Sequence, residues 1–191
     1  MTDGAAFGGP APATASSIER IRRHIREVPD FPKPGISFKD ITPLIEDGST
    51  FCVAVDEMAH ATEDIDYARI LSADARGFVF GAALAYKGHK GLILARKKGK
   101  LPRKTVSVRY ELEYGSEVLE VHADSIPAGA RVLVVDDLLA TGGTARAMCQ
   151  LVENAGGIVT GVAFLVELRQ LRGRERLVPY HPVTSILAYD R

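Results

Sequence analysis

From residue 69 onward the chain alternates short aliphatic runs with longer stretches of helical periodicity. The aliphatic runs lie at residues 70–71, 92–95, 132–135 and 158–165. An alanine-rich stretch after the first run ends at Gly88, and a helical stretch after the third run passes through Leu151 and stops at Gly156. Short continuous aliphatic strands between helices are typical of a parallel sheet covered on both faces. We therefore predict an α/β fold with a central, mostly parallel sheet flanked by helices.

A helix is predicted before this region. Residues 16–19 read Ser-Ser-Ile-Glu, a capping-box pattern at the start of a helix. The spacing of Ile18, Ile21 and Ile25 gives this helix an apolar face, and Pro29 requires it to end earlier.

Residues 1–15 differ from the rest of the chain in composition. They are rich in Ala, Gly, Pro and Thr, so they have too little large apolar surface to offset the entropy lost on ordering. We predict a disordered tail at residues 1–15 and a single domain over residues 16–191, in which a second helix lies around Phe51, Val55 and Met58.

Apolar and polar residues alternate from Val106 to Leu112, which is the period of a half-buried strand. Residues 113–116 read Glu-Tyr-Gly-Ser and turn the chain back through Leu119 and Val121. We predict a protruding, flexible β-hairpin at about residues 105–122, which we call the flap.

Composition narrows the class of protein. The chain has 24 basic and 24 acidic side chains, so no overall field attracts it to nucleic acid or to an anionic membrane. It has no apolar run near the roughly 18 residues of a membrane span and no signal-peptide pattern. We expect a cytoplasmic protein without nucleic-acid or membrane partners, whose function depends on a specific pocket.

One stretch carries the clearest chemistry, Val-Leu-Val-Val-Asp-Asp-Leu-Leu-Ala-Thr-Gly-Gly-Thr at residues 132–144. A loop between a parallel strand and a helix presents unpaired backbone N–H groups to an anion. The loop residues that we expect to hold a phosphate are Ala140, Thr141, Gly142, Gly143 and Thr144. The two glycines let the backbone approach closely, and no lysine follows them, so this is not a nucleoside-triphosphate P-loop.

Asp136 and Asp137 precede this loop directly. Two adjacent carboxylates would repel each other and a bare phosphate, so they need hydroxyl donors or a cation. A phosphorylated sugar supplies both, because its phosphate fits the loop while its vicinal hydroxyls donate to the aspartates. The alternative is a structural strand end with helix-capping aspartates and a glycine turn.

The stretch at residues 132–144 resembles the motif by which type I phosphoribosyltransferases bind 5-phosphoribosyl 1-diphosphate (PRPP). Four further segments resemble the adenine-specific members of that family, at residues 31–41, 75–81, 96–102 and 113–115. The resemblance implies the type I phosphoribosyltransferase fold with a small N-terminal base-binding hood. It also implies a pentosyltransferase of purine salvage that converts adenine and PRPP to AMP and diphosphate through an oxocarbenium-like transition state.

The resemblance further implies a base site. Phe38 would stack on the purine and Leu168 would cover its other face, while the backbones at Ser37 and Lys39 would read its edge. Lys39 stands where many family members have arginine, which leaves the fine specificity open. From pattern alone, the alternative for Phe38 is a core aromatic at the rim of the sheet, and an isolated leucine such as Leu168 is more often a packing residue.

Residues 96–104 carry six cations in nine positions, so a strongly anionic partner is expected. The resemblance places Arg76 over the diphosphate, has Arg96, Lys97 and Lys100 contribute to that pocket, and implies a homodimer in which some of these residues come from the second subunit. A solvated charged loop or an RNA-binding patch is the alternative meaning of such a run.

The five histidines show no metal-ligand spacing, so no protein-built metal site is expected. The expected cofactor is Mg²⁺, held mainly through substrate and water. Glu113, at the tip of the flap, is the candidate acid or base for the adenine nitrogens, although a glutamate in a polar turn is more often simply solvated.

Two other functions remain open at this stage. The same fold could act on xanthine, hypoxanthine or guanine, which competition among purines would reveal. A non-catalytic PRPP-sensing regulator would share the phosphate loop, but such proteins usually carry a basic DNA-binding domain, and only a short neutral tail precedes the core here.

Overall fold

The computed structural model describes residues 15–111 and 116–190. The chain divides into two compact units, Met1–His60 and Ala61–Arg191. The predicted tail lies almost wholly outside the described residues, and the single domain stays a prediction. No helix among the described residues is long and apolar enough to cross a membrane.

The first unit contains three helices and a two-stranded ribbon among its described residues. In chain order they are α1 (Ala15–Arg23), β1 (Arg26–Val28), β2 (Phe38–Asp40), α2 (Thr42–Glu46) and α3 (Gly48–His60). The expected second helix is therefore present as α3. The first helix is shorter than predicted, because residues 26–28 leave it to pair with β2 in antiparallel fashion. Pro29 disfavours helical backbone at the residue before it, which favours this extended alternative.

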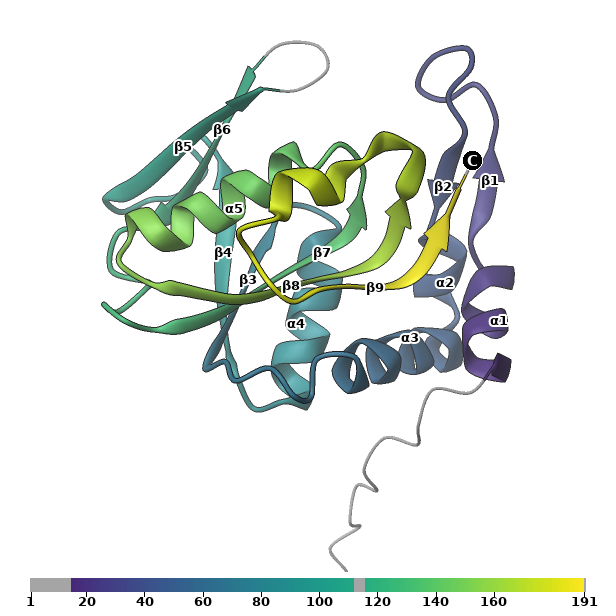
Figure 1. Ribbon diagram of the computed structural model, residues 1–191, viewed down its shortest axis with the longest axis horizontal. Helices are drawn as coiled ribbons and strands as arrows, with labels where there is room; N and C mark the ends of the chain where they lie inside the picture. The colour runs from purple at the N-terminus through teal and green to yellow at the C-terminus, as the bar shows by residue number, and fades with distance from the viewer. Residues whose placement is uncertain (1–14, 112–115, 191) are drawn as a thin grey trace, which may run out of the picture. The chain divides into compact units, whose positions relative to one another are not determined.

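The second unit is built on a seven-stranded sheet (Figure 1). Its strands are β3 (Arg69–Ala73), β4 (Gly91–Lys97), β5 (Thr105–Glu111), β6 (Ser116–His122), β7 (Arg131–Leu139), β8 (Ile158–Leu168) and β9 (Val183–Tyr189). The spatial order is β5-β6-β4-β3-β7-β8-β9. Within this order the neighbouring strands β4, β3, β7, β8 and β9 pair in parallel, whereas β6 pairs antiparallel with both β4 and β5. This confirms the predicted mostly parallel α/β fold.

Two helices cover this sheet. The crossover from β3 to β4 contains α4 (Gly77–Lys87), and the crossover from β7 to β8 contains α5 (Gly143–Asn154). The two crossovers run toward opposite edges of the sheet, so right-handed connections place the helices on opposite faces. Figure 1 shows α4 and α5 on either side of the strands. Covered on both faces, β7 has four consecutive fully buried aliphatic residues at positions 132–135.

The predicted flap is present as the β5–β6 hairpin, with Thr105 opposite His122 and Glu111 opposite Ser116. Its tip at residues 112–115 lies outside the described residues. The hairpin extends the sheet because β6 pairs with the end of β4, where Arg96 lies opposite Glu120. After β8 the chain forms two short 3₁₀ helices, η1 (Arg169–Leu171) and η2 (Gly173–Leu177), before β9. The sequence pattern did not predict these last elements.

Candidate active site

A cavity of about 220 Å³ lies where the connections of the sheet change direction. From β3 the chain crosses to β4 on one side, and from β7 it crosses to β8 on the other, so β3 and β7 are neighbours whose following loops diverge. Crevices of this kind, at the carboxyl ends of parallel strands, are where α/β proteins bind ligands. The cavity is lined by residues 73–77 from the first loop and residues 136–145 from the second.

The second loop forms the start of α5. Gly142 has φ +80° and caps the helix, and no side chain makes a capping hydrogen bond there. The first N–H groups of α5 and the positive end of its dipole are therefore directed to the cavity, where Thr141 and Thr144 add hydroxyl groups. This is the arrangement that binds a phosphate.

Gly173, the first residue of η2, supports this loop from behind. It is buried, and a Cβ on it would lie 2.9 Å from the backbone nitrogen of Gly142 and would overlap the carbonyl oxygen of Ala140. The two backbones are thus in direct contact. The sequence pattern does not indicate Gly173, because a single glycine in a polar stretch has no periodic signal.

Strand β7 carries the acidic pair to the rim of the cavity. Asp136 and Asp137 are 8% and 6% exposed, and the backbone nitrogen of Asp137 donates to Asp136 Oδ1 at 3.0 Å. Burial, and next the adjacent charge of Asp137, raise the pKa of Asp136 well above its ordinary value of 3.8. A Cβ on Gly77 would lie 3.3 Å from Asp136 Cγ, so the start of α4 also closes on this carboxyl group.

The loop after β3 and the end of β4 each bring an arginine to the acidic groups of the cavity. Arg76 Nε lies 2.9 Å from Asp137 Oδ2 as an ion pair, although that oxygen has no partner with hydrogen-bond geometry. Arg96, at the end of β4, donates to Asp74 Oδ2 at 3.3 Å. Asp74 Oδ1 is buried without a hydrogen-bond partner. The predicted residues Arg76 and Arg96 therefore lie beside the acidic groups of the cavity.

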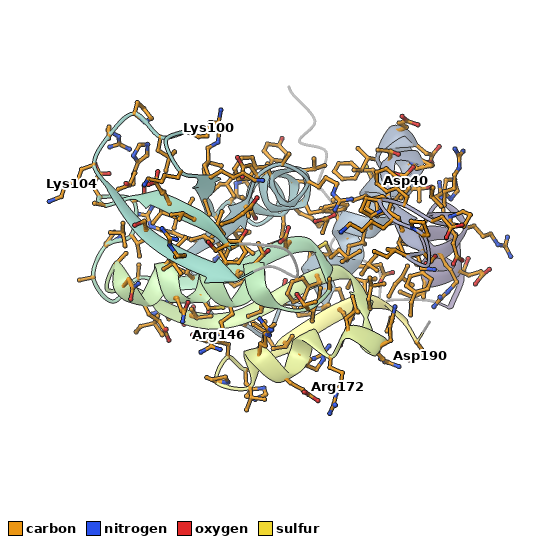
Figure 2. All side chains as sticks on the ribbon, turned by 90° about the horizontal axis from the view of Figure 1, so that it is seen from above. Asp40, Lys100, Lys104, Arg146, Arg172 and Asp190 are labelled. Carbon is orange, nitrogen blue, oxygen red and sulfur yellow. The ribbon has the colours of Figure 1, made fainter. Side chains whose placement is uncertain are left out.

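The other predicted cations lie farther out. Lys97 Nζ is 2.7 Å from Glu117 Oε1 on β6, and that pairing raises the pKa of Lys97. Lys100 is exposed, and Figure 2 shows Lys100 and Lys104 projecting outward from the segment between β4 and β5. Neither Lys97 nor Lys100 lines the cavity.

Tyr110 on β5 is a second residue near the site that the sequence pattern did not indicate. Its hydroxyl donates to Glu117 Oε2 at 3.1 Å, and burial raises its pKa to about 12, although the neighbouring side chain of Thr144 in the phosphate loop lowers that pKa. Tyr110 thus connects the hairpin with the loop. The alternation of residues 106–112 predicts that Tyr110 faces inward, but it does not identify the residues that Tyr110 contacts.

The predicted base-site residues lie in both units. In the first unit, the ring of Phe38 packs edge-on against Phe31, with centroids 5.2 Å apart. Lys39 is buried and its Nζ is 3.0 Å from Glu27 Oε1, which also accepts a hydrogen bond from Ser37. Leu168 ends β8 in the second unit and is half-buried. Glu113 lies outside the described residues.

The donors around the cavity decide whether Mg²⁺ would fit. Asp74, Asp136 and Asp137 provide carboxylate oxygens, the ligands that Mg²⁺ prefers. Within residues 15–111 and 116–190, no group of three or more His, Cys, Asp or Glu is arranged to hold a metal ion. The carboxylates therefore suit an ion that also takes ligands from a substrate and from water.

Comparisons with known proteins agree with this geometry. A family model described as a phosphoribosyl transferase domain matches residues 45–188. The adenine phosphoribosyltransferase of Rubrobacter xylanophilus is 62% identical over 176 residues, which cover 92% of this chain and 95% of the relative. That of Pseudothermotoga lettingae is 52% identical over 169 residues, covering 88% and 99% of the two chains.

Solved structures give the same result. The adenine phosphoribosyltransferase of Thermoanaerobacter pseudethanolicus superposes with a TM-score of 0.88 at 49% identity and covers 90% of this chain and 99% of its own. That of Saccharomyces cerevisiae, solved with an imino-altritol bisphosphate and adenine, has a TM-score of 0.85 at 35% identity and covers 91% and 100%. The chain belongs to the type I phosphoribosyltransferases and, within them, to the adenine phosphoribosyltransferase family.

Proposed function

We propose that the cavity between β3 and β7 binds PRPP and that the chain transfers its phosphoribosyl group to adenine, which gives AMP and diphosphate. Adenine phosphoribosyltransferases are pentosyltransferases of purine salvage, and the similarity to them extends over about nine tenths of the chain. The observation that carries the proposal is the position of a phosphate-binding loop beside a buried acidic pair in one cavity.

PRPP binding follows from the charges of this cavity. The N–H groups at the start of α5, with Thr141 and Thr144, would hold the 5-phosphate. Asp136 and Asp137 would accept hydrogen bonds from the ribose hydroxyls, because their buried carboxylates need donors. Ala140 and Gly143 complete the loop by bringing its backbone close to the ligand.

Negative charge accumulates on the diphosphate as it leaves. Arg76 lies at the cavity and would stabilise this charge, with Arg96 behind it. Lys97 and Lys100, which do not line the cavity, would contribute only if the segment after β4 moves, or from a second subunit. Asp74 and Asp137, each with a carboxylate oxygen that lacks a hydrogen-bond partner, would help to hold Mg²⁺, which would supply further charge neutralisation when bound.

Adenine would be held by the residues named from the family resemblance. Phe38 would stack on the ring with Leu168 opposite, and the backbones of Ser37 and Lys39 would select the base. N9 of adenine would then attack C1 of the ribose as the bond to the diphosphate breaks, with an oxocarbenium-like transition state. Glu113 would accept the proton that adenine loses as the bond from N9 to C1 forms, and closure of the flap would exclude water.

The homodimer and the cytoplasmic location remain predictions. Tyr86 on α4 and Leu94 on β4 are 83% and 42% exposed, and we propose these two side chains as part of the contact between subunits. Sedimentation analysis of the purified protein tests the dimer, and a single-chain mass at working concentrations would contradict it.

One assay tests the proposed function. The protein is incubated with PRPP, Mg²⁺ and adenine, and AMP is measured by chromatography, with hypoxanthine, guanine and xanthine as competing bases. We expect AMP as the main product and loss of activity on chelation of Mg²⁺. Formation of another nucleotide in preference to AMP would reassign the substrate, and binding of PRPP without turnover would favour a regulator.

A further inference from the structure

A charged cluster outside the cavity connects the end of β8 with η2 and β9. Glu167 is 5% exposed, and Arg174 approaches it with two nitrogens, Nε at 3.0 Å from Oε1 and Nη2 in contact with Oε2. Ser185 on β9 donates to Glu167 Oε2 at 2.6 Å. Arg174 also donates through Nη1 to the carbonyl oxygen of Val183 at 2.6 Å. Forked pairs of this kind fix direction as well as distance.

The charges of this cluster are satisfied within it. Arg174 lowers the pKa of Glu167, and Glu167 raises that of Arg174, so each stabilises the charged form of the other. Arg174 is therefore unsuited to bind a phosphate directly, because its guanidinium is already committed to a carboxylate and a carbonyl group. An effect on the ligand has to pass through the backbone that Arg174 holds.

The residue before Arg174 is Gly173. Gly173 is the glycine whose main chain contacts Ala140 and Gly142 in the phosphate loop, so closely that neither Gly142 nor Gly173 has space for a Cβ. On the other side of the cluster, Glu167 is followed by Leu168, the residue proposed to cover the base. The cluster thus lies between two parts of the proposed substrate site.

We propose that Glu167, Arg174 and Ser185 are positioning residues, which hold the main chain of Gly173 against the phosphate loop and thereby set the direction of the N–H groups that bind the 5-phosphate. The proposal rests on the proposed function, because it assigns these residues to the same PRPP site. A cluster with a purely structural role would affect folding but not the affinity for the phosphate group.

The test measures binding of ribose 5-phosphate by calorimetry, because this probe carries the phosphate and the sugar without the diphosphate. The variants are Glu167→Gln, Arg174→Lys, Arg174→Ala and Ser185→Ala. We expect each to raise the Kd for ribose 5-phosphate, by about tenfold for Glu167→Gln, since small misplacements of binding groups have effects of this size or larger. At saturating PRPP, kcat should fall less than the affinity does.

Arg174→Lys separates charge from geometry. The lysine keeps the positive charge but loses the fork that reaches Glu167 and Val183 together. We expect it to bind ribose 5-phosphate almost as poorly as Arg174→Ala. Full affinity in the lysine variant would overturn the proposal.

The matched controls are Arg172→Ala and Glu175→Gln. These residues flank Arg174 in the same segment and form an exposed pair in which Arg172 Nε donates to Glu175 Oε1 at 2.7 Å. Figure 2 shows Arg172 directed outward from the protein. The controls should bind ribose 5-phosphate like the wild type, because an exposed pair contributes little to local order. Equal losses in controls and cluster variants would overturn the proposal.

Breaking a buried ion pair can prevent folding, so Ser185→Ala provides the milder variant. It removes the hydrogen bond from Ser185 to Glu167 and the one that Ser185 Oγ accepts from Arg174 Nη2 at 3.2 Å, but leaves the ion pair in place. A folded Ser185→Ala protein with wild-type affinity would overturn the positioning role. The proposed function has a separate readout in the wild type. If the wild type binds ribose 5-phosphate but makes no AMP, the function fails and the positioning role can still be measured, whereas a wild type that binds no ribose 5-phosphate overturns both.

Discussion

Gly142 and Gly173 come from segments separated by a helix and a strand, yet each fills the space that a side chain on the other would need. A Cβ on Gly142 would lie 3.1 Å from the carbonyl carbon of Gly173 and would overlap its oxygen. Gly142 also has φ +80°, which side-chain-bearing residues rarely adopt.

Gly142→Ala is therefore expected to lower both thermal stability and PRPP affinity. The left-handed backbone alone costs about 1–3 kcal/mol in a residue with a side chain, and the overlap with Gly173 adds to it. Gly48→Ala is the control, because a Cβ at Gly48 meets nothing within 4 Å. Thermal melts and calorimetric titration with PRPP test the pair, and equal behaviour of the two variants would contradict the prediction.

Arg76→Ala is expected to reduce kcat by about a hundredfold, because one well-placed group that stabilises transition-state charge contributes a few kcal/mol. Arg131→Ala is the comparison. Arg131 forms an exposed ion pair with Asp66 at 3.0 Å, at the opposite end of β7 from the cavity. Steady-state kinetics should show normal turnover for Arg131→Ala, and an active Arg76→Ala enzyme would remove Arg76 from the mechanism.

PRPP binding is expected to release protons. The pKa of Asp136 is raised in the free protein by burial and by the charge of Asp137, whereas hydrogen bonds from ribose hydroxyls favour the charged carboxylate and lower the pKa again. Between these two pKa values binding expels a proton, so affinity should rise with pH through that range. Calorimetry in buffers with different ionisation enthalpies measures the number released.

The raised pKa of Asp136 also makes the stability of the folded protein depend on pH. A carboxyl group with a raised pKa in the folded state binds more protons there than in the unfolded state. Its contribution to the free energy of unfolding therefore falls as pH rises from 3.8 toward the raised value.

Asp137→Asn removes the charge next to Asp136, so this variant should release fewer protons on binding PRPP and should bind PRPP more weakly. Unchanged proton release in this variant would show that Asp137 does not control Asp136.

Glu113→Gln is expected to lower kcat with adenine and to leave the affinity for PRPP nearly unchanged, because the proposed proton exchange involves the base and not the sugar. Ser107→Ala, an exposed position on the same hairpin, should behave like the wild type. Wild-type turnover in the glutamine variant would exclude Glu113 from proton transfer.

The sequence by itself determined the alternation of strands and helices, the phosphate loop and the acidic pair. Each of these has a local signal. Aliphatic runs with short turns specify parallel strands, and residues 136–144 combine two carboxylates, two glycines and a helix start within one connection. For the same reason the flap could be predicted from alternation, although its inward-facing Tyr110 could not be matched with Thr144.

Only the tertiary structure decided which distant residues meet. Asp74, which follows β3, meets Arg96 at the end of β4 because β3 and β4 pair. Gly173 contacts the phosphate loop because η2 packs against α5, the helix that this loop begins. The early end of the first helix has a similar origin, since residues 26–28 gain partners on β2. Contacts between segments far apart in sequence depend on packing, and packing leaves no periodic mark in a single chain.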